Sequence, residues 1–225
     1  MRIRRKPWAE PELKACPFCI QEPNQYRGTW NTVFKNEAPI YLELGCGKGG
    51  FISQIAPQNL DINFIAVDMI DSMLGLAKRK LEVAYTEKNI PTDNIKIFIK
   101  NIERISEVFG DGDIIDRIYI NFCNPWDRKK KHQKKRLTHP RQLEQYLTFL
   151  SPNGEIYFKT DSDVLFDASL EYFKEMNFNI EYITYDLHNS NFEPNYITEH
   201  EKMFSDEGIK IKFLIAKRPL VDIQP

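Results

Sequence analysis

The sequence predicts an α/β protein, a three-layer sandwich with a doubly wound, mostly parallel sheet of seven strands. Two observations carry this prediction. Apolar strand-like runs alternate with helical patterns from Pro39 onward, and a glycine cluster directly follows the first run. No internal repeat or low-complexity segment interrupts this alternation. We therefore expect one α/β domain over residues 37–219.

Seven short segments have the composition of strands. In the third, isoleucines alternate with other residues, as in a strand with one buried face. The fourth is almost wholly apolar, so we expect it in the centre of the sheet. The predicted strands cover residues 40–44, 63–68, 94–100, 116–122, 155–159, 179–185 and 210–216.

Four segments between these strands have helical patterns. They cover residues 51–56, 72–88, 138–150 and 163–176. The helix over 138–150 is predicted to begin with Thr138 as its N-cap and Pro140 in its first turn. The Ser-Pro-Asn-Gly segment at 151–154 is expected to form a turn before the fifth strand.

The two ends of the chain lack this alternation. Residues 1–36 are rich in proline and aromatic residues, and we expect an extended arm that packs on or near the site. Residues 220–225 are expected to form a tail. The basic start is not followed by an apolar stretch, and no apolar run approaches membrane-spanning length. These observations predict a cytoplasmic protein without a membrane contact.

Four cysteines raise the question of a metal or a disulfide. Cys16 and Cys19 form a C-x-x-C pair, but a zinc site normally needs a second pair, so no metal is expected. Cys46 and Cys123 follow the first and fourth strands and could approach each other. A reducing compartment would keep them as thiols.

The glycine cluster after the first strand is the expected place for a nucleotide. Gly45, Gly47 and Gly50 form a tight turn between a strand and a helix, where backbone amides can approach a ligand closely. The same glycines also satisfy the G-x-G-x-x-G pattern of dinucleotide-binding proteins. A nucleotide-dependent oxidoreductase is therefore one alternative, and a plain structural turn is another.

Glu43 distinguishes between these interpretations of the glycine cluster. A carboxylate two residues before the first glycine would face a phosphate in a dinucleotide enzyme, which is electrostatically unfavourable. It would suit S-adenosylmethionine, which has no phosphate and carries a sulfonium and an ammonium group. Asp68 ends the next strand, where it could accept both ribose hydroxyls. The alternative for Glu43 is a partly buried, paired acid.

A second set of residues follows the fourth strand, which neighbours the first in a doubly wound sheet. Asn124, Pro125 and Trp126 form a pattern typical of enzymes that methylate the nitrogen of a planar base. Alone, it would indicate a plain turn. The cationic segment 128–136 follows in a chain of net charge −1, and it is long enough to run along a phosphate backbone. The alternatives are a solvated loop and an RNA-binding module without catalysis.

The chain resembles the bacterial tRNA (guanine-N7-)-methyltransferases, the TrmB family, over residues 8–219. The motifs are E-x-G-x-G-K-G at 43–49, N-F-x-[DN]-P-W with a basic loop and R-L-T at 121–138, F-K-T-D at 158–161 and T-E-x-E-x-x-F-x-x-x-G at 198–208. The resemblance implies a Rossmann-like class I methyltransferase that moves a methyl group from S-adenosylmethionine to N7 of a guanine in the tRNA variable loop. We expect a monomer or homodimer without an obligate protein partner.

The resemblance also implies roles for particular residues. The cofactor would be held by Glu43, Gly45, Gly47, Asp68, Asn101 and Asn124, with Asn124 as the catalytic position between cofactor and base. The guanosine would be held by Arg128 or Lys129, Asp161, Thr198, Glu199, His200 and Glu201.

This chain departs from the family at some of these positions. Asn124 replaces a commoner Asp, His200 replaces a commoner Tyr, and Asp127 replaces a proline. The basic loop is one residue longer, which leaves open whether Arg128 or Lys129 contacts the guanosine.

The expected chemistry needs no general base, because N7 of guanine has a free lone pair and carries no proton. Catalysis is then mostly orientation. Asp161 and Glu201 could stabilise the cationic product ring, or could accept hydrogen bonds from the guanine N1 and amino groups. Asn124 is expected to act by hydrogen bonding through its carbonyl oxygen.

Overall fold

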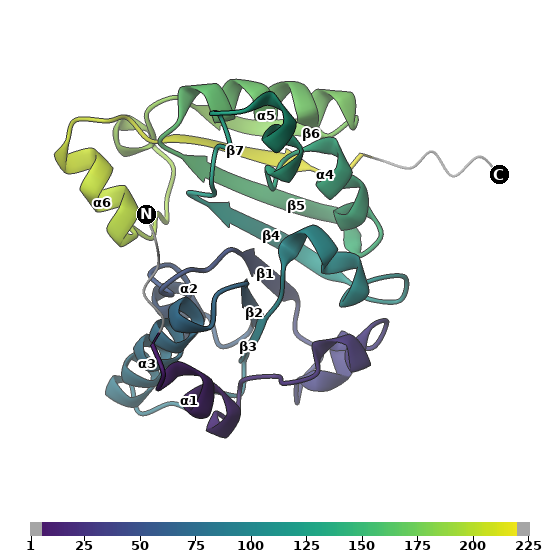
Figure 1. Ribbon diagram of the computed structural model, residues 1–225, viewed down its shortest axis with the longest axis vertical. Coiled ribbons are helices and arrows are strands. Elements are labelled where there is room, and N and C mark those ends of the chain that lie inside the picture. The colour runs from purple at the N-terminus through teal and green to yellow at the C-terminus, as the bar shows by residue number, and fades with distance from the viewer. Residues whose placement is uncertain (1–5, 220–225) are drawn as a thin grey trace.

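The computed structural model describes residues 6–219 and confirms the predicted three-layer α/β fold (Figure 1). The strands are β1 (Ile40–Leu44), β2 (Asn63–Asp68), β3 (Ile95–Ile99), β4 (Ile115–Asn121), β5 (Leu150–Thr160), β6 (Asn179–Thr184) and β7 (Lys212–Lys217). The α-helices are α1 (Ala9–Ala15), α2 (Ile52–Ile55), α3 (Asp71–Glu87), α4 (Pro140–Leu147), α5 (Asp163–Glu175) and α6 (Glu199–Asp206). Six short 3-10 helices connect them within this part of the chain.

All seven strands belong to one sheet in the order β3-β2-β1-β4-β5-β7-β6. β7 runs antiparallel to both of its neighbours, and the other pairs are parallel. The expectation that the fourth strand lies beside the first is confirmed. The strand order reverses direction between β1 and β4, where ligands bind in doubly wound sheets, at the carboxyl ends of the strands.

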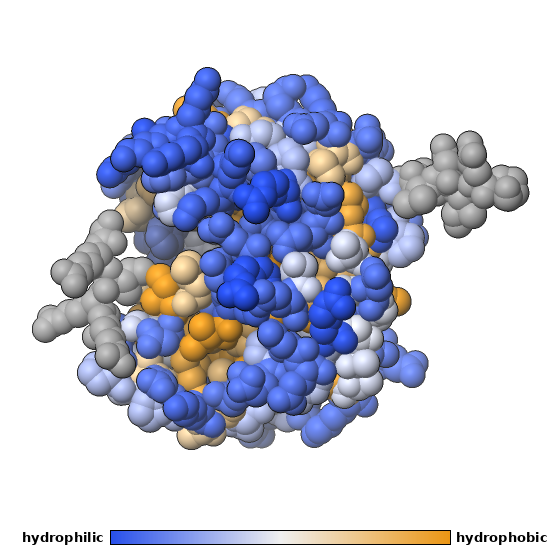
Figure 2. Space-filling model, turned by 45° about the vertical axis from the view of Figure 1, so that its right-hand side comes forward, coloured by the Kyte–Doolittle hydropathy of each residue, from blue (hydrophilic) through white to orange (hydrophobic). Residues whose placement is uncertain are grey.

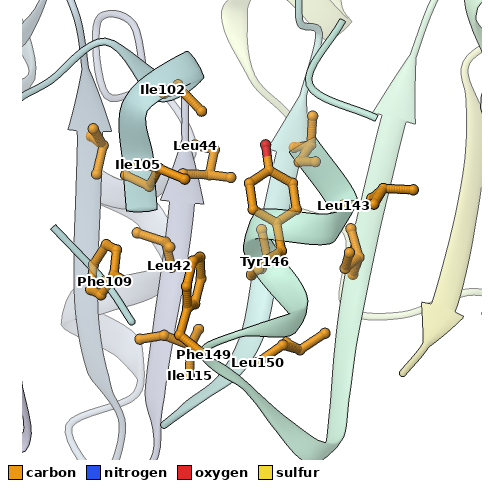
Figure 3. Packing of buried hydrophobic residues seen from close by; sticks show 14 of the residues in the cluster. Leu42, Leu44, Ile102, Ile105, Phe109, Ile115, Leu143, Tyr146, Phe149 and Leu150 are labelled. Carbon is orange, nitrogen blue, oxygen red and sulfur yellow. The ribbon is translucent and has the colours of Figure 1, made fainter. Parts of the chain in front are cut away.

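Alternate residues of the central strands bury their side chains on opposite faces of the sheet. Leu42 and Leu44 of β1 pack in one apolar cluster with residues from α4 and α5, including Tyr146 (Figure 3). Phe64 and Ala66 of β2 pack in a second cluster with α1, α2 and α3. The period-two alternation of a strand thus builds both cores at once.

The predicted turn at 151–154 is wrong as a boundary between elements, because β5 already begins at Leu150. Ile115 of β4 pairs with Leu150, and the next pair is Arg117 with Glu155. Four residues of β5 therefore bulge opposite a single residue of β4 before pairing resumes. Pro152 lies in this bulge, where its missing N–H interrupts no ladder hydrogen bond.

The predicted start of α4 is wrong by one residue. His139 is the N-cap, and its Nδ1 accepts a hydrogen bond from the N–H of Arg141 at 3.2 Å, while Pro140 is the first helical residue. Thr138 is buried, and its hydroxyl lies 2.7 Å from the hydroxyl of Ser169 on α5. A tertiary contact with α5 thus takes the side chain that the local pattern assigns to capping.

The described part of the N-terminal segment, 6–36, is not the extended arm that the sequence predicts. α1 packs on α3, and Cys19 forms a parallel bridge with Ile97 beside β3. Trp30 is fully buried and donates from Nε1 to the carbonyl oxygen of Val108 at 2.9 Å. The aromatic residues therefore cover the β3 side of the sheet.

Three further points concern the ends of the chain, its helices and its surface. The predicted tail at 220–225 and the first five residues lie outside the described residues. Within 6–219, no helix is long and apolar enough to cross a membrane. The face shown in Figure 2 is mostly hydrophilic, with hydrophobic residues in small patches.

Candidate cofactor and substrate site

The glycine turn after β1 is held by backbone hydrogen bonds to β2. The N–H groups of Gly45 and Cys46 both donate to the carbonyl oxygen of Val67, at 2.9 and 3.0 Å. Gly45 and Gly47 have φ angles of 81° and 54°, a left-handed conformation that a side chain would strain. The turn is therefore fixed beside the carboxyl ends of two strands.

Asp68, at the end of β2, ties its strand to this turn. Its Oδ2 accepts a hydrogen bond from Gly47 N–H at 2.9 Å, and its Oδ1 accepts one from Ile70 N–H at 2.9 Å. Burial raises the pKa of Asp68, while these two N–H groups oppose the shift. Because each carboxylate oxygen can accept a second hydrogen bond, Asp68 can still bind ribose hydroxyls.

Glu43 is the buried acid of the site, with 3% of its surface exposed. Its Oε1 accepts from Asn121 Nδ2 at 3.3 Å, whereas Oε2 has no hydrogen-bond partner among the described residues. Burial raises the pKa of Glu43 to about 8; the Asn121 hydrogen bond opposes the shift, and the charge of Asp68 adds to it. A buried oxygen without a donor is unfavourable. This site therefore suits a ligand that supplies a cationic or N–H group.

These contacts distinguish the two ligand classes left open by the glycine pattern. The ammonium and sulfonium groups of S-adenosylmethionine would gain from the charges of Glu43 and Asp68. A pyrophosphate would face both acids, and the N–H of Gly47 is already used by Asp68. The residues present thus fit S-adenosylmethionine and do not fit a dinucleotide.

The turn that opens α6 lies against the glycine turn. Thr198 is the N-cap of α6, and its Oγ1 accepts from Glu201 N–H at 3.1 Å. A cavity of about 90 Å³ between the two turns is lined by residues of both. The lining residues are Glu43, Gly45, Cys46, Gly47, Lys48, Gly50, Phe51, Asn121, Phe122, Thr198, Glu199 and His200.

Contacts from α2 and α3 hold this turn in place. Gln54 Nε2 donates to the carbonyl oxygen of Ile197 at 2.9 Å. The carboxylate of Glu199 forms an ion pair with Lys80 of α3. His200 stacks near Phe122, with ring centroids 6.4 Å apart and ring planes at 20°. The structure thus brings two aromatic rings to the edge of the cavity.

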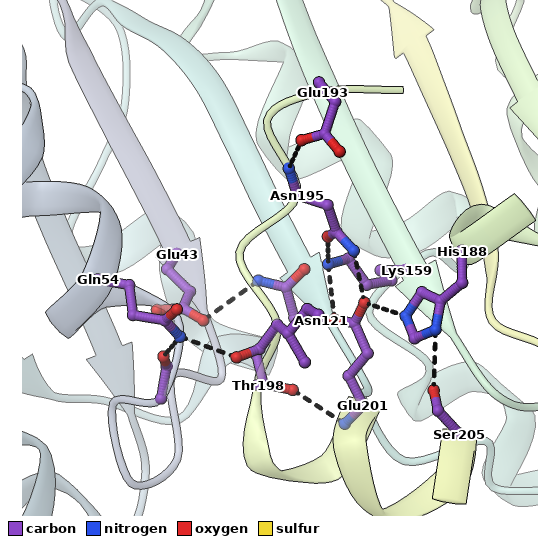
Figure 4. A network of polar contacts seen from close by, with 12 residues as sticks. Glu43, Gln54, Asn121, Lys159, His188, Glu193, Asn195, Thr198, Glu201 and Ser205 are labelled. Atoms are coloured by element: carbon purple, nitrogen blue, oxygen red, sulfur yellow. Dashed lines mark hydrogen bonds and ion pairs between the residues drawn. The ribbon is translucent and has the colours of Figure 1, made fainter. Parts of the chain in front are cut away.

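Glu201 is fully buried at the centre of a polar network (Figure 4). Its Oε2 accepts from Lys159 Nζ at 2.9 Å, and its Oε1 accepts from Asn195 Nδ2 at 2.8 Å. His188 Nε2 lies 2.8 Å from the same Oε1. Burial acts to raise the pKa of Glu201, but the charge of Lys159 and these hydrogen bonds outweigh it, so the pKa is lowered.

The other predicted residues do not line this cavity. Asn101 follows β3 and is exposed, with Oδ1 accepting from Glu103 N–H at 3.0 Å. It lies close to Asp68, because the neighbouring Lys100 N–H donates to the carbonyl oxygen of Asp68 at 3.0 Å. Asp161 follows β5, and its carbonyl oxygen accepts from Lys212 Nζ at 2.9 Å.

Asn124 is exposed in the loop after β4, and its side chain holds that loop. Its Oδ1 accepts from the N–H of Trp126 at 3.0 Å, across Pro125. Phe122 and Trp126 have φ angles of 52° and 47°, which are uncommon for residues with side chains. The loop is therefore held in a specific conformation at the carboxyl end of β4.

The basic segment 128–136 follows this loop and lies on the surface except for Arg136, which is buried and donates from Nε to the carbonyl oxygen of Pro125 at 2.7 Å. Arg128 and Lys129 are exposed, and the 3-10 helix Lys130–Lys135 buries none of its residues. Lys135 lies 5.3 Å from the ring of Trp126 and 3.7 Å from the carboxylate of Glu103. Most of the positive charge of this segment thus faces solvent beside the site.

Sequence reasoning missed several residues that build the site. Asn121 and Lys159 lie inside the motifs at 121–138 and 158–161, but the resemblance assigns cofactor and guanosine contacts to other residues of these motifs. No local signal marks four further residues, because their partners are distant in sequence: Gln54, Lys80, His188 and Asn195.

A larger cavity of about 300 Å³ lies beyond Asn121 and Lys159, but none of the glycines of the turn lines it.

The cysteines form no bonded pair in the described chain. Cys16, Cys19, Cys46 and Cys123 are all free thiols. Burial raises the pKa of Cys46 well above its usual value, with the charges of Glu43 and Asp68 adding to the shift. Within residues 6–219, no group of three or more His, Cys, Asp or Glu side chains could hold a metal ion.

Solved structures share this fold. The 16S rRNA methyltransferase KamB matches with a TM-score of 0.61 at 12% identity, over 84% of this chain and 92% of that chain. The antibiotic-resistance methyltransferase Kmr matches with a TM-score of 0.56 at 15% identity, over 84% of this chain and 91% of that chain. The family model Methyltransf_4, described as "Putative methyltransferase", matches residues 37–214. Fold and site together define a class I methyltransferase, which uses S-adenosylmethionine as methyl donor.

Sequence relatives place the chain more narrowly. The tRNA (guanine-N(7)-)-methyltransferase of Clostridium beijerinckii is 62% identical, over 97% of this chain and 99% of that protein. The protein of the same name from Acetivibrio thermocellus is 54% identical, over 97% of this chain and 100% of that protein. The chain belongs to the tRNA (guanine-N(7)-)-methyltransferase family.

Proposed function

We propose that the protein transfers a methyl group from S-adenosylmethionine to N7 of a guanine in the variable loop of tRNA, which forms 7-methylguanosine. The observation that carries this proposal is the position of Glu43. Glu43 lines the cavity between the glycine turn and the turn that opens α6, and its buried Oε2 has no hydrogen-bond partner among the described residues. The turn expected to bind the cofactor and the turn expected to bind the substrate thus both lie beside the carboxylate of Glu43.

The cofactor side of the site is built from the ends of the central strands. Glu43, Gly45, Gly47, Asp68 and Asn101 would hold S-adenosylmethionine, with Glu43 toward its cationic groups and Asp68 toward its ribose. When bound, the cofactor supplies an electrophilic methyl group. The turn fixed by Val67 and Asp68 decides where that group lies relative to β4.

The substrate side is built from the loops after β4 and β5 and from the turn that opens α6. Asp161 and the turn of Thr198, Glu199 and His200, followed by the buried Glu201, would hold the guanosine, and Asn124 would lie between the cofactor and the base. Phe122 and His200 offer ring faces on which a base can stack. Arg128 or Lys129 would contact the nucleotide phosphate or sugar, since both are exposed beside this loop.

Catalysis in this site is a matter of orientation. The guanine N7 lone pair attacks the methyl carbon directly, so no side chain has to remove a proton. The base becomes cationic in the reaction, and carboxylates close to it lower the energy of that charge. Of the two acids expected near the base, Asp161 is partly exposed, whereas Glu201 is fully buried.

The partner of this surface is tRNA, held largely through phosphates by the exposed cations of residues 128–135. We expect the protein to act in the cytoplasm as a monomer or homodimer, without an obligate protein partner.

The experiment is methylation of unmodified tRNA with radiolabelled S-adenosylmethionine, followed by nucleoside analysis. We expect label in 7-methylguanosine, and its loss when the guanine of the variable loop is replaced by adenine. Label in another nucleoside, or none at all, would overturn the proposal. Tight NAD binding without S-adenosylmethionine binding would favour an oxidoreductase instead.

A further inference from the structure

The buried cation Lys159 has no role in the proposed reaction, although it lies beside the candidate site and lines the larger neighbouring cavity. Its side chain is 6% exposed, and it stands beside Asn121 in the pairing of β4 with β5. Asn121 in turn donates to Glu43. Burial lowers the pKa of Lys159, whereas the nearby charges of Glu201 and Glu43 act to raise it. A buried ammonium group persists only where such partners compensate its lost hydration.

The partners of Lys159 are the network around Glu201. Lys159 Nζ donates to Glu201 Oε2 at 2.9 Å and to Asn195 Oδ1 at 2.7 Å. Asn195 Nδ2 then donates to Glu201 Oε1 at 2.8 Å, which closes a ring of hydrogen bonds. His188 Nε2 lies 2.8 Å from the same oxygen, and its Nδ1 lies 3.2 Å from Ser205 Oγ on α6.

Burial of Glu201 argues against direct contact with the base. The residue has 0% exposure, and three side chains already surround its two carboxylate oxygens. A guanine N–H cannot reach it while the network is intact. Its backbone N–H, however, donates to Thr198 Oγ1, and Thr198, Glu199 and His200 line the cavity beside Glu43.

We propose that Lys159 is a positioning residue that holds Glu201, and through it the turn 198–200, against the cofactor pocket. Glu201 then acts as the anchor of the substrate turn and does not contact guanine. This inference deepens the proposed function and rests on it for the identity of the substrate. The ion pair itself is independent of that identity.

The charge balance of the pair suggests the test. Removing one partner of a buried ion pair leaves an uncompensated charge, whereas removing both charges does not. Lys159→Met leaves a buried carboxylate, and Glu201→Gln leaves a buried ammonium group. The double variant Lys159→Met/Glu201→Gln carries neither charge, and its glutamine keeps an amide oxygen for Asn195 and His188.

The experiment compares the wild type, both single variants and the double variant. We expect each single variant to lower kcat/KM for tRNA about tenfold or more, and the double variant to recover most of that loss. The Kd for S-adenosylhomocysteine should change by less than about threefold in all four proteins, because the glycine turn is untouched. A double variant as poor as the product of the two single effects would mean that the Glu201 carboxylate contacts substrate, and would overturn the proposal.

A second readout needs neither tRNA nor catalysis. Lys202 lies on α6 with its side chain 71% exposed, so trypsin cleavage there reports how firmly the turn is held. Lys159→Met should speed this cleavage and the double variant should slow it again. Equal cleavage rates in all four proteins would overturn the proposal, even if the wild type methylates no tRNA.

If Lys159→Met does not fold, Asn195→Ala replaces it in the same two measurements. It removes one donor to Glu201 and the acceptor for Lys159, but it leaves the ion pair. We expect faster cleavage at Lys202 and a several-fold lower kcat/KM, with the Kd for S-adenosylhomocysteine unchanged. Wild-type values of both in Asn195→Ala and in Glu201→Gln, which removes the charge of the ion pair, would overturn the proposal.

Discussion

The N–H of Gly47 donates a hydrogen bond of 2.9 Å to Oδ2 of Asp68, across the ends of two neighbouring strands. One carboxylate thereby shapes the glycine turn and remains available to a ligand. Loss of Asp68 should therefore disturb both functions at once. Glu43 lies in the adjacent strand and makes no contact of this kind with the turn.

The first prediction follows from this difference. Glu43→Ala and Asp68→Ala should each weaken binding of S-adenosylmethionine, with the larger loss for Asp68, while tRNA affinity changes little. A hydrogen bond to a charged group contributes about 1.5–3 kcal/mol, so a loss of about tenfold to a hundredfold is expected. Isothermal titration measures both affinities. Unchanged cofactor affinity in both variants would show that these acids do not bind it.

A second prediction concerns the pH dependence of cofactor binding. The pKa of Glu43 is raised to about 8, so the ligand-free acid is largely protonated at neutral pH. A cationic ligand favours the carboxylate, and its affinity should therefore rise between about pH 6 and 8 and level off above. The ratio of the wild-type Kd to that of Glu43→Gln removes the ligand's own titration. A ratio that is constant across this range would contradict the prediction.

The same group gives a prediction for stability. A folded-state pKa of about 8, above the ordinary value of 4.5, means that folding favours the protonated acid. This contribution is complete below pH 4.5 and disappears as the pH rises to about 8. The Tm of the wild type relative to Glu43→Gln should fall across that window. Thermal unfolding at several pH values measures it, and a rising difference would contradict the assignment.

The basic segment gives a prediction about salt. Neutral residues at Lys130, Lys131, Lys134 and Lys135 should weaken tRNA binding and flatten its dependence on salt concentration. The slope of log K against log salt should fall by at most about one unit per lost phosphate contact. A matched control neutralises four exposed lysines elsewhere, at Lys14, Lys35, Lys88 and Lys174. Equal slopes for both variants would indicate that the segment is a solvated loop without phosphate contacts.

The last prediction concerns Asn124, whose Oδ1 accepts from Trp126 N–H. An aspartate can accept the same hydrogen bond, so Asn124→Asp should stay within about threefold of the wild-type kcat. Asn124→Ala loses the acceptor, and kcat should fall about fivefold, as expected for one hydrogen bond of about 1 kcal/mol. Single-turnover methylation of tRNA measures both. An inactive Asn124→Asp variant would show that the amide group itself is required.

Residue patterns close together in sequence predicted the strands well. β1 and β2 begin and end where the sequence predicts, because each strand is a short apolar run with a clear local end. Glu43 and Asp68 could be identified as site residues for the same reason. In a parallel sheet the carboxyl ends of neighbouring strands share one edge, so their terminal acids lie near each other.

The sequence alone therefore determined the fold class, the seven strands, the four helices between them and the acids at the strand ends, because local periodicity and turn residues encode these features; it did not predict α1 or α6. Only the tertiary structure decided that Glu201 is buried against Lys159, that His139 and not Thr138 caps α4, and that the N-terminal segment covers the sheet beside β3. Each of these depends on a partner about 30 or more residues away, and a side chain's partner is set by which strands and helices pack side by side. Local sequence carries no record of that packing.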